Sequence, residues 1–425
     1  MKKIVYIAIC IALVANLAAC GNNSKGSAVL SPVYPKSISF EDYNGRQAII
    51  KENPVDKSYM DGVNNFSYDS ASKILKGQPS NITYSPLSLY MALALAGTGA
   101  SGVTQDEIFS ALGVSGKGTD FLSNQTSNLF RRMYSDNEVG KIKIANSIWL
   151  SNDTNFKESL ISNAAENFYA SSYNVDFSDN NTAKLMSKWI SENTNDILSP
   201  EIDINPLQIM SIINTVYFKD EWVDRFKANN TKPDTFYLKD GSRIECDFMN
   251  MTYNIAHGYT KGEGYTRSSL SLKNSGSMIF ILPDKGVSVD ELLSTKEKVA
   301  LLFNGEEEDA GKVIFQIPKF SFGSNLDLNG TLKAMGITSA FEGNADFTGI
   351  TDDVAFISGV EQQTHIAIDE KGVEAAAFTK IDYAGSAPSN GKVAKMILDK
   401  PFIFAIKAYD GTILFVGVVN NPKEI

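Results

Sequence analysis

Residues 81–108 read NITYSPLSLYMALALAGTGASGVTQDEI, and this stretch predicts a buried helix. Ser85 supplies a capping hydroxyl directly before Pro86, which suits the first helical position because its missing N–H would have no partner there. The residues from Leu87 to Leu95 are almost all apolar. A helix that is apolar all round is expected inside a large core rather than at a surface.

Further helices are indicated downstream. Thr104 and Glu107 have the spacing of a capping box, and Gly113 should end the helix that they begin. Helical patterns also cover roughly residues 157–170 and 181–197. These segments predict a helix-rich first half.

Strand patterns dominate the later part of the chain. They cover residues 141–150, 209–219, 277–283, 312–322, 354–360, 402–409 and 412–419. The last two are joined by Asp410-Gly411, a dipeptide typical of a tight hairpin. Because helices come first and strands later without regular alternation, the predicted fold class is a mixed α+β domain rather than a parallel β–α–β sheet.

The composition limits the class of partner. The chain has 425 residues, of which 43% are apolar, and can therefore form a sizeable core. Its net charge is −10. A nucleic-acid binder needs a dense field of lysine and arginine for the phosphates, so we expect no nucleic-acid partner.

The N-terminus has the order of a secretory signal. Two lysines precede the apolar run Ile4 to Ala18, which is short for a membrane span. The ending Leu17-Ala18-Ala19-Cys20 resembles a bacterial lipoprotein signal, in which the cysteine is lipidated and begins the mature chain. We therefore expect a signal peptide at 1–19 and a lipid on Cys20 that anchors the protein in the bacterial cell envelope, facing the periplasm or the cell surface. An ordinary secretory signal is the alternative.

A flexible tether is expected at residues 20–50, because this stretch is polar, contains Pro32 and Pro35, and has no apolar period. The folded domain would then occupy 51–425. If Cys20 carries the lipid, Cys246 is the remaining cysteine of the mature chain, and no intrachain disulfide is possible.

The sequence offers little to an enzyme. It has two histidines, His257 and His365, and lacks a G-x-S-x-G elbow, zinc-binding spacings of Cys and His, a Walker lysine loop and a dinucleotide fingerprint. A hydrolase would have to use one of the two histidines as its base, and a structural or solvent-facing role is favoured for His365. We expect no enzyme activity, no metal and no cofactor.

Several blocks together resemble the serpin family, in the family's order, from about residue 60 to 425. They are residues 81–108, INTVYFKDEW (213–222) with Phe226, Thr231 and Phe236 after it, IPKFSF (317–322), LKAMGITSAF with ADFTGI (332–350), and KPFIFAIK with ILFVGVVNNP (400–422). The resemblance implies the serpin fold, with a helix-rich N-terminal part, a large central mixed β-sheet, smaller sheets and an exposed reactive-centre loop. It also implies a single-use inhibitor of serine endopeptidases, with cysteine endopeptidases as a further class.

The resemblance assigns the reactive loop to residues 369–391, DEKGVEAAAFTKIDYAGSAPSNG. In the family a target protease cleaves this loop, and the part before the cut inserts as a strand into the central sheet. Because side chains alternate along a strand, the small or apolar Val373, Ala375, Ala377, Thr379 and Ile381 would share one face, and Phe378 would lie on the other. The hinge residues are Glu370, Gly372, Val373, Glu374, Ala375, Ala376, Ala377, Phe378 and Thr379.

Val373 departs from the threonine or serine that inhibitory members usually carry. It is uncharged and β-branched, so it should still enter a sheet readily.

The family's count, which takes the hinge glutamate as the first residue and the bond after the seventeenth, predicts cleavage between Ser386 and Ala387. A count anchored on Pro401 would place the bond near Asn390-Gly391 instead. The preceding residues are mostly small, and they favour an elastase-like or subtilisin-like endopeptidase as the partner of a monomeric inhibitor; they are Tyr383, Ala384 and Gly385.

Other targets stay open. Tyr383 could direct a chymotrypsin-like cut or fill a second subsite of a cysteine protease. Lys392 and Lys395 would suit a trypsin-like enzyme if the bond lies well beyond the hinge count.

Four residues match family positions beneath the strands that part when the sheet opens: Ser85, Ser88, Asn214 and Gln362. The family usually has His-Lys where this chain has Gln362-Gln363. Gln362 can still donate and accept hydrogen bonds, although it cannot titrate. Together with Val373, this departure supports the alternative function, a non-inhibitory serpin that acts as a binding or structural protein.

Overall fold

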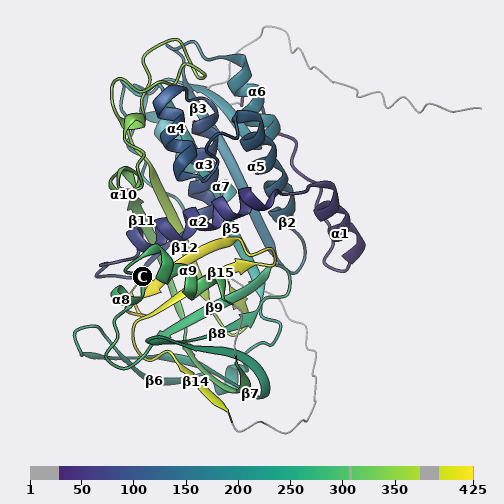
Figure 1. Ribbon diagram of the computed structural model, residues 1–425, viewed down its shortest axis with the longest axis vertical. Coiled ribbons are helices and arrows are strands. Elements are labelled where there is room, and N and C mark those ends of the chain that lie inside the picture. The colour runs from purple at the N-terminus through teal and green to yellow at the C-terminus, as the bar shows by residue number, and fades with distance from the viewer. Residues whose placement is uncertain (1–27, 306–308, 374–391, 425) are drawn as a thin grey trace, which may run out of the picture.

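The computed structural model describes residues 28–305, 309–373 and 392–424, which form two β-sheets and a group of helices (Figure 1). The helices of the first half gather at one end of the molecule, and one of the sheets lies at the other end (Figure 1). The α-helices are α1 (Tyr43–Glu52), α2 (Lys57–Ile74), α3 (Pro86–Thr98), α4 (Gly102–Ala111), α5 (Thr119–Met133), α6 (Glu158–Asn167), α7 (Asn180–Asn193), α8 (Val289–Leu292), α9 (Lys296–Asn304) and α10 (Asn329–Ala334); the 3₁₀ turns are η1 (Ala228–Asn230) and η2 (Ser339–Phe341).

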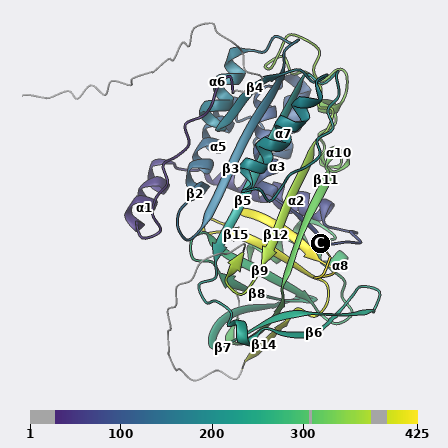
Figure 2. The ribbon, with the colours of Figure 1, turned by 180° about the vertical axis from the view of Figure 1, so that it is seen from behind.

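The first sheet, which we call the central sheet, runs along the length of the molecule (Figure 2). Its spatial order is β11 (Phe320–Asp327), β12 (Glu361–Ile368), β13 (Gly372–Val373), β5 (Met210–Glu221), β3 (Lys141–Ser151) and β2 (Ser135–Asp136), and β4 (Ala170–Val175) pairs with β3. The short strand β13 is antiparallel to both β12 and β5, so those two long strands run parallel to each other.

The second sheet, which we call the lower sheet, occupies the end below the central sheet in Figure 1. Its order is β1 (Ile82–Tyr84), β16 (Ile413–Val419), β15 (Phe402–Ala408), β9 (Gly276–Pro283), β8 (Tyr265–Ser271), β7 (Arg243–Gly262), β10 (Asp309–Pro318) and β14 (Val393–Ile397), with β6 (Lys232–Tyr237) beside β7. The chain passes from the lower to the central sheet at Lys319, between β10 and β11.

Helix α3 lies between the two sheets, as its apolar sequence predicts. It packs against β5 of the central sheet and β16 of the lower sheet, and Leu87 and Tyr90 are fully buried. Each buried side chain of this size contributes about 1.5–3 kcal/mol. The Ser85 hydroxyl accepts a hydrogen bond from the Ser88 N–H at 3.2 Å, so the predicted cap is confirmed.

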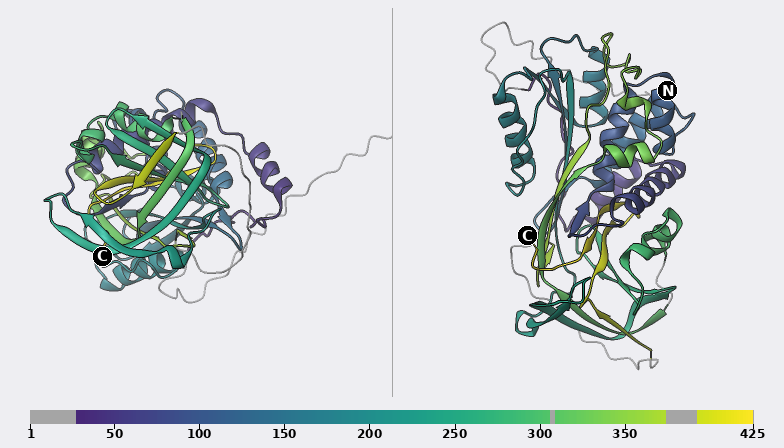
Figure 3. Two further views of the ribbon diagram at one scale, coloured as in Figure 1. Left: turned by 90° about the horizontal axis from the view of Figure 1, so that it is seen from below. Right: turned by 90° about the vertical axis from the view of Figure 1, so that its left-hand side faces the viewer.

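Helix α7 covers the opposite face of the central sheet (Figure 3, right). It contributes Met186, Trp189 and Ile190 to a separate apolar cluster with Trp149 of β3. The central sheet is therefore buried on both faces where α7 crosses it.

Two predicted elements differ from the structure. Residues 354–360 form no strand, and the strand begins just after them, as β12. Glu107 does not cap its own helix: its carboxylate accepts hydrogen bonds from the Thr338 and Ser339 N–H groups at 2.8 and 2.7 Å. These N–H groups lie at the start of η2, where no helical partner exists, so a distant carboxylate satisfies them.

The predicted tether boundary at residue 50 is too late. Leu30 forms an antiparallel bridge with Ser172 on the edge of β4. Tyr34 stacks on Tyr134 with 5.5 Å between ring centroids. Residues 43–52 then form α1, whose first turn is capped by Asp42. Aromatic packing and strand pairing thus attach the chain to the domain from about residue 29 onward, which composition alone did not reveal.

Cys246 is a buried free thiol, and burial raises its pKa to about 11. Within residues 28–305, 309–373 and 392–424, no helix is long and apolar enough to cross a membrane. The same ranges contain no cluster of three or more His, Cys, Asp or Glu side chains that could hold a metal ion.

Candidate functional site

A tight turn leads from β12 into β13. The Asp369 carboxylate accepts hydrogen bonds from the Lys371 N–H at 2.7 Å and the Gly372 N–H at 3.2 Å, and the Asp369 N–H donates to the Gly372 carbonyl at 3.0 Å. Trp222 fixes this turn from β5, because its indole N–H donates to the Asp369 carbonyl at 2.9 Å and its backbone N–H donates to the Lys371 carbonyl at 3.0 Å. The chain therefore enters β13 in a defined direction.

Glu370, the first predicted hinge residue, is held by two side chains. Its carboxylate pairs with the Lys319 ammonium at 3.0 Å and accepts a hydrogen bond from the Thr231 hydroxyl at 2.8 Å. Partial burial alone would raise the pKa of Glu370, but the hydrogen bonds and the nearby Lys319 charge outweigh it and hold the pKa below its usual value. Glu370 is thus an ionised anchor at neutral pH.

Gly372 and Val373 already form a strand between β12 and β5. Val373 is 1% exposed and lies opposite Asp220 and Ile368. A Cβ atom on Gly372 would lie 2.1 Å from the Asp220 carbonyl oxygen, so a side chain has no space there. The close approach of β13 to β5 explains why glycine occupies this position.

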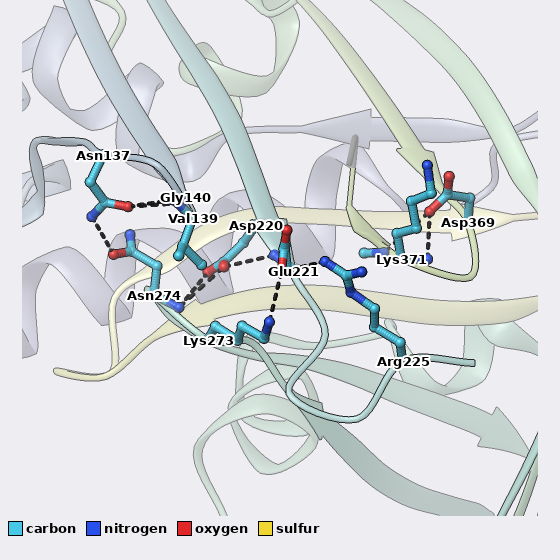
Figure 4. A network of polar contacts seen from close by, with 11 residues as sticks. Asn137, Val139, Gly140, Asp220, Glu221, Arg225, Lys273, Asn274, Asp369 and Lys371 are labelled. Carbon is cyan, nitrogen blue, oxygen red and sulfur yellow. Dashed lines mark hydrogen bonds and ion pairs between the residues drawn. The ribbon is translucent and has the colours of Figure 1, made fainter. Parts of the chain in front are cut away.

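Asp220 supports β5 opposite the hinge (Figure 4). Its carboxylate is fully buried and accepts hydrogen bonds from the Ser275 N–H at 2.8 Å, the Asn274 N–H at 3.1 Å, the Glu221 N–H at 2.8 Å and the Ser275 hydroxyl. Burial raises the pKa of Asp220 to about 6, although these donors act in the opposite direction. The carboxylate thus fastens the β8–β9 turn to the end of β5.

The neighbouring Glu221 forms ion pairs with two basic side chains of this region. It pairs with Lys273 at 2.8 Å and Arg225 at 2.6 Å (Figure 4). Partial burial acts to raise its pKa, but these two cations hold the pKa below its usual value. Asn274 extends the network to the β2–β3 turn by accepting a hydrogen bond from the Asn137 amide at 2.7 Å.

On the side of β13 that faces away from the lower sheet, the two long strands are separate. Among the described residues, β12 and β5 are joined in the sheet only through β13. The residues from Met210 to Asn214 of β5 are half-buried, although β5 lies in the middle of the strand order. The facing edges of β5 and β12 are therefore not paired with each other along most of their length.

The structure brings together three of the four predicted sheet-opening residues. The Gln362 amide accepts from the Ser85 N–H at 2.8 Å and donates to the Ser85 carbonyl at 3.0 Å, and Ser88 lies one turn away on α3. Asn214 lies apart from them on β5, where its amide donates to Asn146. The Asn214 Oδ1 atom is buried and has no hydrogen-bond partner within the described part of the chain.

The histidine that a hydrolase could use has a serine beside it. His365 Nε2 lies 3.2 Å from the Ser321 hydroxyl on the neighbouring strand β11. Burial lowers the pKa of His365. Among the described residues, no carboxylate accepts a hydrogen bond from this imidazole, so the pair lacks the orienting member of a triad.

The remaining predicted site residues lie outside the described residues. They are Cys20, the hinge residues Glu374, Ala375, Ala376, Ala377, Phe378 and Thr379, and the loop residues Tyr383, Ala384, Gly385, Ser386 and Ala387.

The supporting residues of the hinge were missed by sequence reasoning. They are Lys319, Asp220, Glu221, Trp222, Arg225, Lys273 and Asn274. A signal existed, because Lys219, Asp220 and Glu221 place three charges at the end of a strand that is otherwise uncharged. Arg225 lies four residues from Glu221, but Lys273 and Asn274 lie about fifty residues away, and only the fold brings them to Asp220 and Glu221.

Comparisons with known proteins agree with this geometry. The family model described as serpin (serine protease inhibitor) matches residues 61–422. Human neuroserpin is 31% identical over 372 residues, which cover 82% of this chain and 88% of neuroserpin. An uncharacterised serpin-like protein of Thermococcus kodakarensis is 31% identical over 392 residues, which cover 88% of each protein. The crystal structure of the thermophilic serpin tengpin in its native state superposes with a TM-score of 0.79 at 26% identity, covering 93% of this chain and 100% of tengpin.

The fold is that of an α+β protein whose central sheet carries a short strand, β13, between two long parallel strands. The chain belongs to the serpin family, whose members are in general protease inhibitors rather than enzymes. The predicted fold class and family are thus confirmed.

Proposed function

We propose that this protein inhibits serine endopeptidases as a single-use trap, in which residues after Val373 insert between β5 and β12 once the loop is cleaved. The proposal rests on the position of strand β13 between β5 and β12. This strand of two residues already separates two parallel strands whose facing edges are otherwise not paired with each other. The alanine-rich segment continues directly from it.

Extending the register of β13 gives each inserted residue a defined pair of neighbours. Val373 lies opposite Asp220 and Ile368, and each later residue would step back by one on both strands. Ala375 would then lie between Phe218 and Ile366, which are both buried. Small side chains suit this inner face because little free volume is available in a packed core.

Further along the same register, Ala377 would lie between Val216 and Thr364, and Thr379 between Asn214 and Gln362. The Thr379 hydroxyl would thereby reach the level of the Asn214 Oδ1 atom, which is buried without a partner among the described residues. A buried acceptor without a donor is destabilising, and a donor that arrives with the strand would relieve this cost. This contact gives Asn214 a role in receiving the inserted strand.

Insertion supplies the free energy for the trap. On the order of ten new ladder hydrogen bonds at about 0.5–1.5 kcal/mol each would contribute about 5–15 kcal/mol. Strand β13 already lies beside Asp220 and Glu221, so a strand that fills the space beside the other ten of the twelve residues of β5 carries its end roughly 33 Å along the sheet. The acyl-enzyme is carried with it, and a displacement of catalytic groups by about 1 Å already costs roughly a hundredfold in rate. Deacylation then stalls.

The proposed cleavage site is Ser386-Ala387, with Tyr383, Ala384 and Gly385 as the residues that the protease reads. An elastase-like or subtilisin-like endopeptidase is the proposed partner, and the inhibitor acts as a monomer. We further propose that lipid on Cys20 anchors the protein to the bacterial envelope.

Incubation with an elastase, followed by a denaturing gel and mass spectrometry, tests the proposal. We expect a covalent complex at the summed mass and a released peptide that begins at Ala387. A released peptide with another first residue would disprove the proposed bond. Cleavage of the loop without any complex would refute the trap.

A second candidate is a non-inhibitory binding protein. It is favoured by the two hydrogen bonds between Gln362 and Ser85, which fasten β12 to α3 on the side where the sheet must open. This candidate predicts cleavage without a complex and no rise in thermal stability after cleavage, because no strand is inserted.

A further inference from the structure

The attachment of the N-terminal segment limits how an anchored protein can stand on a membrane. The described chain starts beside β4, where the Val29 N–H donates to the Ser172 carbonyl at 2.7 Å. The position predicted to carry the lipid, Cys20, precedes Ala28 by only eight residues. Eight residues span at most about 29 Å when fully extended. The membrane surface must therefore lie near the end of the molecule that carries β4.

Strand β13, after which the predicted reactive loop follows in sequence, lies far from this attachment. Through the strand registers, the attachment at Ser172 lies level with Ile212 of β5, because both pair with Ile148 of β3. Val373 of β13, by contrast, lies opposite Asp220 of β5. Eight residues of β5 separate these two levels, which corresponds to about 26 Å along the strand. The lower sheet, with β14 after the loop, lies beyond that level (Figures 1 and 2). Reaching the level of β13 would already take about 26 Å of the roughly 29 Å that the tether can span, and the lower sheet lies further on, so the tether is too short for this end of the molecule to face the membrane head-on.

The opposite end exposes large apolar side chains. Leu207 is 87% exposed, Val354 is 75% exposed and Phe356 is 50% exposed. Both of their loops lie at the end of β3: the Ser151 N–H donates to the Ile209 carbonyl at 2.8 Å, and the Thr351 hydroxyl donates to the Asn155 carbonyl at 2.8 Å. We call residues 205–209 and 351–357 the apical loops. Exposed apolar side chains at one end are a feature of interaction surfaces.

The charges around the apical loops select the kind of lipid. Asp153, Asp352 and Asp353 are exposed there, and Lys157 is paired with Asp352 at 3.0 Å. Anionic headgroups would be repelled by these carboxylates, whereas a zwitterionic headgroup layer would not. The exposed apolar side chains can then enter the boundary between headgroups and acyl chains, as interfacial apolar residues do.

We propose that the apical loops contact a zwitterionic lipid surface, so that the anchored inhibitor stands with β13 and β14, the strands on either side of the predicted reactive loop in sequence, away from the membrane. This inference rests on the proposed anchoring through Cys20. In this orientation the inhibitor acts on proteases that approach from the aqueous phase, and not on proteases embedded in the same membrane.

Three single-cysteine probes in a Cys246→Ser background test the orientation. Val354→Cys reports the apical loops, Val393→Cys reports the loop end, and Tyr43→Cys on α1 reports the side of the molecule. The lipidated protein is reconstituted in phosphatidylcholine vesicles, and each cysteine carries an environment-sensitive fluorophore. With brominated phosphatidylcholine we expect the probe at 354 to lose most of its fluorescence and the other two probes to keep theirs.

Other quenching patterns overturn the proposal. Strong quenching at 393 would mean that the loop end faces the lipid, and strong quenching at 43 would mean that the molecule lies on its side. Equal quenching at all three positions would mean that the domain has no fixed orientation. Mass spectrometry of the same preparation reports the modification of Cys20 separately. An unmodified Cys20 would refute the anchoring and this inference together, whereas a lipidated protein with a different pattern would refute the inference alone.

Paired surface variants test the contact itself. Leu207→Ser combined with Phe356→Ser should restore most of the fluorescence of the probe at 354. The matched control is Leu301→Ser on α9, where the replacement of a leucine that is 67% exposed should have no effect. Replacing part of the phosphatidylcholine with an anionic lipid should weaken the quenching, and stronger quenching would contradict the role given to the carboxylates.

Discussion

A charge placed on the inner face of the inserted strand should convert the inhibitor into a substrate. In the register of β13, residue 377 would lie between Val216 and Thr364, and Thr364 is buried. An Ala377→Arg variant would have to bury a guanidinium without a carboxylate partner during insertion. The cost of a buried unpaired ion is several kcal/mol. A penalty of about 3 kcal/mol in the barrier slows a step by roughly two orders of magnitude.

The matched control places the same charge on the outer face. Residue 376 would lie between Tyr217, which is buried, and His365, which is only partly buried. An Ala376→Arg side chain can extend past His365 into solvent, so the insertion rate should change much less than for Ala377→Arg.

Titration of elastase with each variant, followed by a denaturing gel, measures the number of inhibitor molecules consumed per trapped protease. We expect this number to rise steeply for Ala377→Arg, with cleaved monomer in place of complex, and to stay near the native value for Ala376→Arg. Native efficiency of Ala377→Arg, or equal losses in both variants, would show that the register is wrong.

Three further predictions concern the native state. Lys319→Ala should lower the free energy of unfolding by about 1 kcal/mol in a denaturant titration, because its pair with Glu370 is partly exposed and therefore screened; an unchanged midpoint would contradict the anchor role. Tyr34→Ala should cost about 1–2 kcal/mol through lost aromatic packing, whereas Tyr43→Ala, at an exposed position, should cost less than about 0.5 kcal/mol; equal effects would mean that the N-terminal segment adds no stability. Asp220 has a folded pKa of about 6, above its ordinary value, so the folded state binds the proton more tightly and stability should fall by up to about 3 kcal/mol as the pH rises from 4 to 6. Asp220→Asn should remove this pH dependence from thermal unfolding curves, and its persistence would assign the titration to another group.

Local signals identified much of the fold. The cap at Ser85 and the proline after it fixed the start of α3, since both act within one helical turn. The Asp410-Gly411 dipeptide marked the hairpin between β15 and β16, and Gly411 has the positive φ of 95° that such a turn requires. Strands β3, β5 and β9 were found from apolar runs because buried strands need them.

Other elements could not be assigned locally. Glu107 has the spacing of a capping residue, yet it binds a turn more than two hundred residues away. Residues 354–360 have the apolar content of a strand, but they form no strand, and β12 begins immediately after them. In both cases a long-range partner determined the outcome, and a short sequence window cannot contain it.

The sequence by itself determined the family and the α+β class, because the motif blocks and the apolar periods can be read along the chain, and it predicts a hinge segment from the small residues after Gly372. Tertiary structure alone decided how that segment is held. Glu370 meets Lys319 and Thr231, Val373 lies between Asp220 and Ile368, and β12 and β5 are joined through β13. The physical reason is that strand pairing and buried ion pairs depend on residues far apart in the chain, whose register is fixed only when both sheets pack around α3.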